Sequence, residues 1–157
     1  MSDVIRRLSH LRASDPEAVA SALAKRERGM LSFPRKLFLV AADHPGRGVL
    51  AAGGDRGAMA DRGAFLDRLT TALAHPEVDG VLATADIVDD LALLGALNEK
   101  VVFGSMNRGG LAGSVFELDD RFTGYTAAAI ARIVASTERS LLDLPSTVRE
   151  AKTSIIA

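Results

Sequence analysis

One complete strand-then-helix unit lies in residues 78–95, VDGVLATADIVDDLALLG. The first part, residues 78–84, is short and apolar and predicts a strand. From about Asp86 to Asn98 the spacing of the apolar side chains is that of one helix face. A buried strand that leads directly into an amphipathic helix is the repeating unit of folds with a parallel sheet. This stretch therefore predicts an α/β protein.

Similar units lie on both sides of it. Residues 37–42, LFLVAA, are a continuous apolar run and predict a strand buried on both faces, with a helix near residues 61–75 after a Gly-rich loop. Residues 101–105 predict a third strand, and a helix is expected near residues 125–136. Three such units in succession predict parallel strands joined by right-handed crossovers.

The two ends of the chain differ from this middle part. Residues 1–30 predict two helices, the second capped by Ser14 with Glu17 three residues later and ended by Gly29. We expect an N-terminal helical extension over residues 1–30, three strand-then-helix units over 31–136, and a divergent tail over 137–157.

Composition excludes several classes of function. The 157 residues carry 19 Lys and Arg against 20 Asp and Glu, so the net charge of -1 gives no case for binding nucleic acid or an anionic membrane. There is no cysteine, and no apolar run approaches the ~20 residues of a membrane span. No paired-histidine or HExxH spacing predicts a metal, and we expect no cofactor and a cytoplasmic protein.

Polar residues follow each predicted strand, at the edge where parallel α/β folds carry their sites. Asp43 and His44 follow the first strand and are the candidate catalytic residues. The candidate substrate-binding residues follow the second and third strands: Thr84, Asp86, Ser105, Asn107 and Arg108.

Structural roles remain open for most of these residues. Asp86 could be a helix N-cap, Thr84 could satisfy backbone groups, and Ser105 and Asn107 are common in turns. For Asp43 a functional role is the favoured interpretation, because an acid directly after an apolar strand is costly to bury unless it is paired. The GRGVLA run at 46–51 matches a relaxed dinucleotide pattern, but no obvious helix follows it.

Three segments together resemble a known family: AADHPGRG (41–48), the unit at 78–95, and VVFGSMNRGGLAGSVFELDDRFTGY (101–125). They are similar to the opening units of class I aldolase-like (β/α)8 barrels, the superfamily of deoxyribose-phosphate and class I fructose-bisphosphate aldolases. Within it, the subgroup associated with sugar and inositol breakdown is the most similar. The resemblance covers about residues 30–135 and implies a partial TIM barrel.

The resemblance also implies carbon–carbon bond cleavage of a sugar or sugar phosphate through a lysine Schiff base. Asp43 would be the first-strand acid, and His44 its neighbour. However, none of the four lysines (Lys25, Lys36, Lys100 and Lys152) lies at a predicted strand carboxyl end. We therefore expect a chain that stops before the nucleophilic lysine and is inactive alone.

Three strand-then-helix units cannot close a barrel, which needs about 250 residues. We expect the open sheet edges to cause self-association. Two other functions remain possible. One is a stand-alone α/β domain of flavodoxin-like shape that binds an anionic ligand at its strand ends, and the other is a non-catalytic interaction module.

Overall fold

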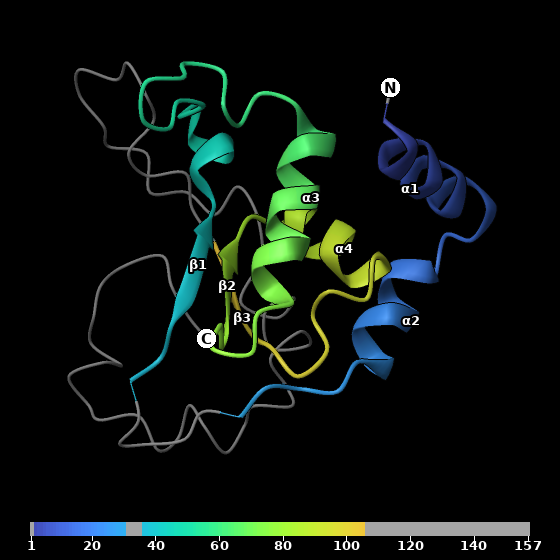
Figure 1. Ribbon diagram of the computed structural model, residues 1–157. Helices are drawn as coiled ribbons and strands as arrows, with labels where there is room; N and C mark the ends of the chain where they lie inside the picture. The colour runs from blue at the N-terminus through green and yellow to red at the C-terminus, as the bar shows by residue number, and fades with distance from the viewer. Residues whose placement is uncertain (1, 31–35, 106–157) are drawn as a thin grey trace, which may run out of the picture.

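The computed structural model describes residues 2–30 and 36–105. The elements follow one another along the chain (Figure 1): α1 (Asp3–Ser14), α2 (Ala18–Lys25), β1 (Leu39–Ala42), the 3-10 turn η1 (His44–Arg47), α3 (Arg62–Leu73), β2 (Gly80–Ala83), α4 (Ala85–Leu93) and β3 (Val101–Gly104). Two strand-then-helix units and a third strand are thus present as predicted. The helix expected near residues 125–136 lies outside the described residues.

The three strands form one parallel sheet in the order β1-β2-β3. Each strand pairs with the next along the chain, and the last aligned row is Ala42, Ala83 and Gly104. An α/β fold with a parallel sheet is therefore confirmed. All the strands point in one direction, so their carboxyl ends meet at one edge of the sheet (Figure 1).

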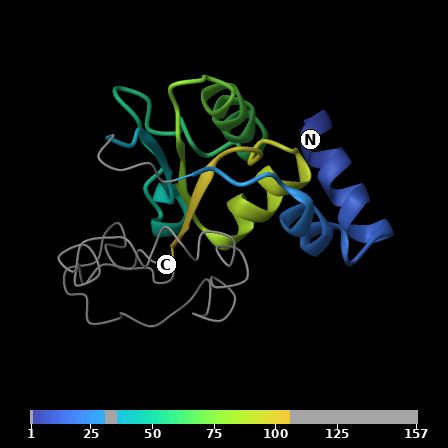
Figure 2. The ribbon, with the colours of Figure 1, turned by 90° about the horizontal axis from the view of Figure 1, so that it is seen from below.

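The helices lie on one face of this sheet, as the two perpendicular views show (Figures 1 and 2). The apolar faces of α3 and α4 meet alternate strand residues there, because side chains along a strand point to opposite faces. The core they form includes Leu66, Leu91, Val81 and Ala83, each fully buried.

The opposite face carries Leu39, Ala41, Leu82 and Phe103. Ala41 is exposed and the other three side chains are half-buried. The prediction that the first strand is buried on both faces is therefore wrong for β1. An unbroken apolar run does not reveal which of its alternate side chains helices will cover.

The N-terminal helices belong to the same core. Leu8 of α1 is 3% exposed within it, and α2 packs against α4. After α2 the chain runs beside the start of β3, where the Gly29 amide donates to the Lys100 carbonyl at 3.3 Å. The extension thus reaches the amino end of β3.

Three predicted helix ends are wrong. The second helix does not end at Gly29, because α2 ends at Lys25 and Gly29 lies beside Lys100. Ser14 closes α1, and its hydroxyl donates to the His10 carbonyl at 2.9 Å, so it does not cap α2. The N-cap of α2 is Glu17, which makes no side-chain capping bond. In the fourth helix, α4 ends at Leu93 because the chain turns at Gly95, whose φ is +72°.

In the part of the chain that the structure describes, no helix has the length and apolar character needed to cross a membrane.

Candidate active site at the carboxyl edge of the sheet

Three predicted site residues lie side by side at the carboxyl edge. Asp43, Thr84 and Ser105 directly follow the last aligned row of the three strands. Because those last residues are paired neighbours in the sheet, the three residues that follow them lie at the same edge. The sequence prediction that these residues share one edge is confirmed, and their roles in catalysis or binding stay predictions.

Asp43 is buried, at 5% exposure, and is held by its own turn. Its Oδ2 accepts a hydrogen bond from Nε of Arg47 at 2.9 Å and forms an ion pair with Nη2 of the same side chain at 2.7 Å. Its Oδ1 lies 3.7 Å from Nδ1 of His44, a half-exposed side chain. The short turn η1 brings Arg47 back, and Gly48 ends it at a φ of +75°. Asp43 is therefore buried and has a charged partner, as expected for an acid that directly follows an apolar strand.

Thr84 contacts this turn. A Cβ placed on Gly46 would lie 2.6 Å from Cγ2 of Thr84, so the absence of a side chain at Gly46 lets η1 approach the start of α4. Ser105 is 4% exposed, and its amide donates to the Ala83 carbonyl at 2.8 Å. These contacts join the ends of the strands into one surface.

Asp86 is oriented differently from the other predicted residues. Its Oδ2 accepts from Nη1 of Arg62 at 2.6 Å, which ties the first turn of α4 to the start of α3. Desolvation would raise the pKa of Asp86, but hydrogen bonds from Thr84 and Arg62 outweigh it and lower the pKa. The N-cap of α4 is Thr84, so the alternative role of Asp86 as the N-cap is wrong.

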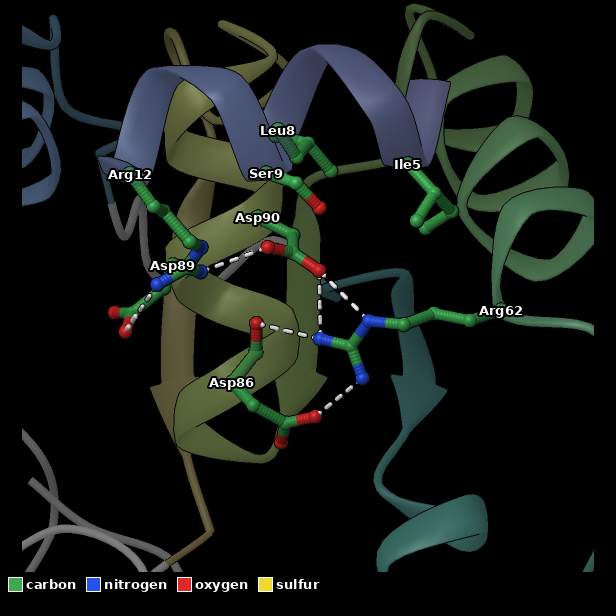
Figure 3. Close-up of a pocket in the computed structure, with 8 residues that line it drawn as sticks. All are labelled: Ile5, Leu8, Ser9, Arg12, Arg62, Asp86, Asp89 and Asp90. Carbon is green, nitrogen blue, oxygen red and sulfur yellow. Dashed lines mark hydrogen bonds and ion pairs between the residues drawn. The ribbon is translucent and has the colours of Figure 1, made fainter. Parts of the chain in front are cut away.

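Arg62 also binds Asp90, one turn further along α4 (Figure 3). Desolvation would lower the pKa of Arg62, but the hydrogen bonds and charges of Asp86 and Asp90 outweigh it and raise the pKa. Asp90 is 4% exposed and also accepts from Arg12 of α1 at 2.7 Å. This ion-pair network lies in the helix layer, beside the carboxyl edge.

The sequence interpretation missed four residues of these networks: Arg12, Arg47, Arg62 and Asp90. Arg47 is four residues after Asp43, and Asp90 is four residues after Asp86, a spacing that places side chains on one side of a helical turn. That spacing was the available signal, whereas nothing local indicates the partner of Arg62. Asn107 and Arg108 lie outside the described residues.

The described lysines lie away from the carboxyl edge. Lys36 precedes β1, Lys25 ends α2, and Lys100 precedes β3 with its Nζ donating to the Val78 carbonyl at 2.7 Å. The prediction that these three do not follow a strand is confirmed, and Lys152 lies outside the described residues. Within residues 2–30 and 36–105, no group of three or more His, Asp or Glu side chains could hold a metal ion.

The edge can therefore do acid–base chemistry on a bound polar molecule. It presents a buried carboxylate with one oxygen fixed by an arginine and the other near an imidazole, beside two hydroxyl-bearing residues. Carboxylate and imidazole groups are the commonest proton acceptors and donors in enzyme sites.

Comparisons with known proteins place the chain in a family. The model of the Cgl0159-like family matches residues 35–155. The crystal structure of Cgl0159 from Corynebacterium glutamicum is similar, with a TM-score of 0.75 and 49% identity over 85% of this chain and 45% of that chain. This chain thus spans less than half the length of that protein. No curated protein matches. Because the family model covers well over half of its residues, the chain belongs to the Cgl0159-like family.

Proposed function

We propose that this chain supplies the opening units of an aldolase-like (β/α)8 barrel, and that its carboxyl edge takes part in aldol cleavage of a sugar or sugar phosphate. The strand order β1-β2-β3 supports this, because the wall of such a barrel is built from strands that pair in chain order. The helices on one face of the sheet agree with the outer ring of a barrel (Figure 2). A doubly wound, flavodoxin-like domain would place helices on both faces and change strand order.

The observation that carries the proposal is buried Asp43 at the carboxyl edge, with one oxygen held by Arg47 and the other near His44. In aldol cleavage a base removes the proton of the hydroxyl on the carbon β to the carbonyl. The carbon–carbon bond breaks, a new carbonyl forms, and the electron pair passes to the carbonyl or imine of the other fragment, which is then protonated. Oδ1 of Asp43 is the oxygen that faces His44, and it would accept the proton.

A class I aldolase also needs a lysine amine as nucleophile. Lys25, Lys36 and Lys100 lie away from the edge, so this amine would come from outside the described residues. The Corynebacterium protein extends well beyond the matched part, since the match covers 45% of its chain. A hybrid of the two chains can therefore test the role of Asp43 in a longer protein.

The hybrid joins residues 1–105 of this chain to the part of the Corynebacterium protein that follows its equivalent of Ser105. Aldehyde release from 2-deoxyribose 5-phosphate and fructose 1,6-bisphosphate is measured, together with borohydride trapping followed by mass spectrometry. We expect cleavage and a trapped adduct, with Asp43→Asn reducing the cleavage rate by about 100-fold or more, a typical loss for a general base.

Asp67→Asn is the matched control, because Asp67 is exposed on α3 and is not among the residues at the carboxyl edge. Its cleavage rate should equal that of the unaltered hybrid. A folded hybrid that shows neither cleavage nor adduct would contradict the proposal, and so would full activity of the Asp43→Asn hybrid.

A further inference from the structure

Arg47 is the charged partner of Asp43, the base proposed above. Asp43 is 5% exposed, and the Arg47 side chain is 28% exposed. Nε of Arg47 donates to Oδ2 of Asp43 at 2.9 Å, and Nη2 of the same side chain lies 2.7 Å from the same oxygen. A guanidinium group is planar and rigid, so its two nitrogen atoms hold a carboxylate in a defined orientation. One oxygen of a buried carboxylate is thus fixed at two points.

The turn η1 brings Arg47 back to Asp43 through local backbone geometry. Pro45 lies in the first turn of η1, where its fixed φ favours a helical backbone. The Gly48 amide donates to the Pro45 carbonyl at 3.0 Å, and the φ of Gly48, +75°, ends the turn. Arg47 is four residues after Asp43, a spacing that brings two side chains to one side of a helical turn. The contact is therefore built into the loop that follows β1.

This contact decides which oxygen of Asp43 is available for chemistry. The last torsion of an aspartate side chain is broad, so either oxygen could otherwise face a substrate. Arg47 holds Oδ2, which leaves Oδ1 on the side of His44, 3.7 Å from its Nδ1. A guanidinium has only donors and stays protonated, so Arg47 itself cannot remove a proton. Any effect of Arg47 on proton transfer must therefore come through Asp43.

We propose that Arg47 is the positioning residue of this site: it holds Asp43 with Oδ1 toward the substrate hydroxyl and does not bind the substrate itself. Its role rests on the aldol cleavage proposed above. A phosphate group could reach Nε and Nη2 only by competing with a buried carboxylate, which is costly. In (β/α)8 barrels a phosphate site frequently follows the seventh and eighth strands, so the phosphate of a sugar phosphate would bind there.

Steady-state kinetics of the hybrid separate positioning from substrate binding. Arg47→Gln should lower kcat for 2-deoxyribose 5-phosphate about 10- to 100-fold, because a misplacement of about 1 Å can cost about 100-fold. KM should change less than about twofold. Arg56→Gln, at an exposed arginine of the loop after η1, is the matched control and should leave both constants unchanged. A raised KM with unchanged kcat would overturn the proposal, since it would show that Arg47 binds the substrate.

Arg47→Lys covers the case in which Arg47→Gln does not fold, because it keeps a positive charge beside the buried carboxylate. It should still lower kcat about tenfold, since an ammonium group lacks the two-point hold of a guanidinium. The loss in either variant should be the same for 2-deoxyribose as for its 5-phosphate. A loss confined to the phosphorylated substrate would overturn the proposal, because it would identify Arg47 as a phosphate ligand.

A double variant tests whether Arg47 acts only through Asp43. Asp43→Asn with Arg47→Gln should cleave as slowly as Asp43→Asn alone, because no carboxylate is left to position. The double change also removes both charges of the buried pair, so neither is left without its partner. If the two losses multiply, Arg47 has a second function and the proposal is wrong.

Nitrogen-15 NMR of the 157-residue chain tests the contact without any turnover. We expect the Nε–H resonance of Arg47 to move in Asp43→Asn, because Oδ2 of Asp43 accepts from this group, and that of Arg56 to stay in place. An Arg47 resonance that does not move would overturn the proposal even if the hybrid is active. A folded hybrid without cleavage, in a chain that shows the expected shift, would instead count against the aldolase function alone.

Discussion

Asp86 and Asp89 lie less than one turn apart on α4, yet their pKa values shift in opposite directions. For both side chains desolvation raises the pKa. At Asp86, close hydrogen bonds from Thr84 and Arg62 outweigh that effect and lower the pKa. At Asp89 the attraction of Arg12 is too weak, and the pKa remains above the ordinary 3.8. The pKa values differ because Asp86 accepts hydrogen bonds from Thr84 and from Arg62, the latter at 2.6 Å. Arg12 lies 4.0 Å from Asp89, whose pKa the charges of Asp90 and Asp86 raise further.

These directions predict opposite effects on stability. The lowered pKa of Asp86 means that its contribution is present above 3.8 and is lost as the pH falls through the folded-state pKa. The raised pKa of Asp89 means that its cost develops as the pH rises from 3.8 through the folded-state pKa. At neutral pH, Asp86→Asn should therefore destabilise the protein and Asp89→Asn should stabilise it. Each effect should be a few tenths to about 1 kcal/mol, because both side chains are partly exposed.

Urea unfolding at a series of pH values measures both variants against the unaltered chain. The stability gained by Asp89→Asn should vanish in acid below 3.8, and the loss caused by Asp86→Asn should vanish below the still lower pKa of Asp86 in the folded protein. Shifts of the same sign in the two variants at neutral pH would show that one of the two assignments is wrong.

The sequence identified Asp43 because a charge directly after an apolar strand needs a partner. It also placed Thr84 and Ser105 at the same edge, because the ends of parallel strands are aligned by pairing alone. It could not show that Asp86 pairs with Arg62. That contact depends on how α3 packs beside α4, which no local pattern encodes.

At the scale of elements, close strand packing depends on Gly80. A Cβ on this residue would overlap the backbone carbonyl of Val101 in β3. Backbone cannot rotate away as a flexible side chain can, so β2 and β3 would have to separate. We expect Gly80→Ala to lower the free energy of unfolding by about 2–4 kcal/mol, in the range of severe steric changes in a core.

Gly54 is the matched control, because a Cβ there meets nothing within 4 Å and its φ is not positive. Gly54→Ala should change the free energy of unfolding by about 0.5 kcal/mol or less. Chemical denaturation of both variants measures the difference. Equal stability of the two variants would show that the β2–β3 contact at Gly80 is not as close as described.

The elements themselves were predicted well where periodicity is strong. The three strands and the helices α3 and α4 were expected in the right order, because apolar runs and helical spacing are local signals. The predicted helix ends were less accurate, because the position of Ser14 at the end of α1 and the stop of α4 depend on backbone geometry at single residues. The sequence did not predict that the N-terminal segment pairs next to β3. The pairing is a single bridge between Arg28 and Lys100, which is too short to produce a pattern of apolar residues.

At the scale of the whole molecule, the sheet has one covered and one less covered face. Among the described residues, the helices pack on one side, while Leu82 and Phe103 on the other side are only half-buried and Ala41 is exposed. In a closed barrel this second face would point inward and be filled by the side chains of other strands. The described residues supply three strands of such a wall.

We propose that copies of the chain associate through this face and through the outer edge of β1, where Phe38 is 59% exposed just before the strand. Among residues 36–105, β1 pairs with β2 alone, and a strand edge next to an apolar face is a template for pairing with another chain. Light scattering across a concentration series should show a mass that rises above that of the 16.5 kDa monomer.

Leu82→Thr should shift this rise to higher concentration, because it removes apolar surface from the associating face while keeping a residue that suits a strand. Leu50→Thr, at an exposed residue of the loop after β1, should leave the association unchanged. A constant monomer mass, or equal effects of the two substitutions, would mean that this face is not the surface through which copies meet.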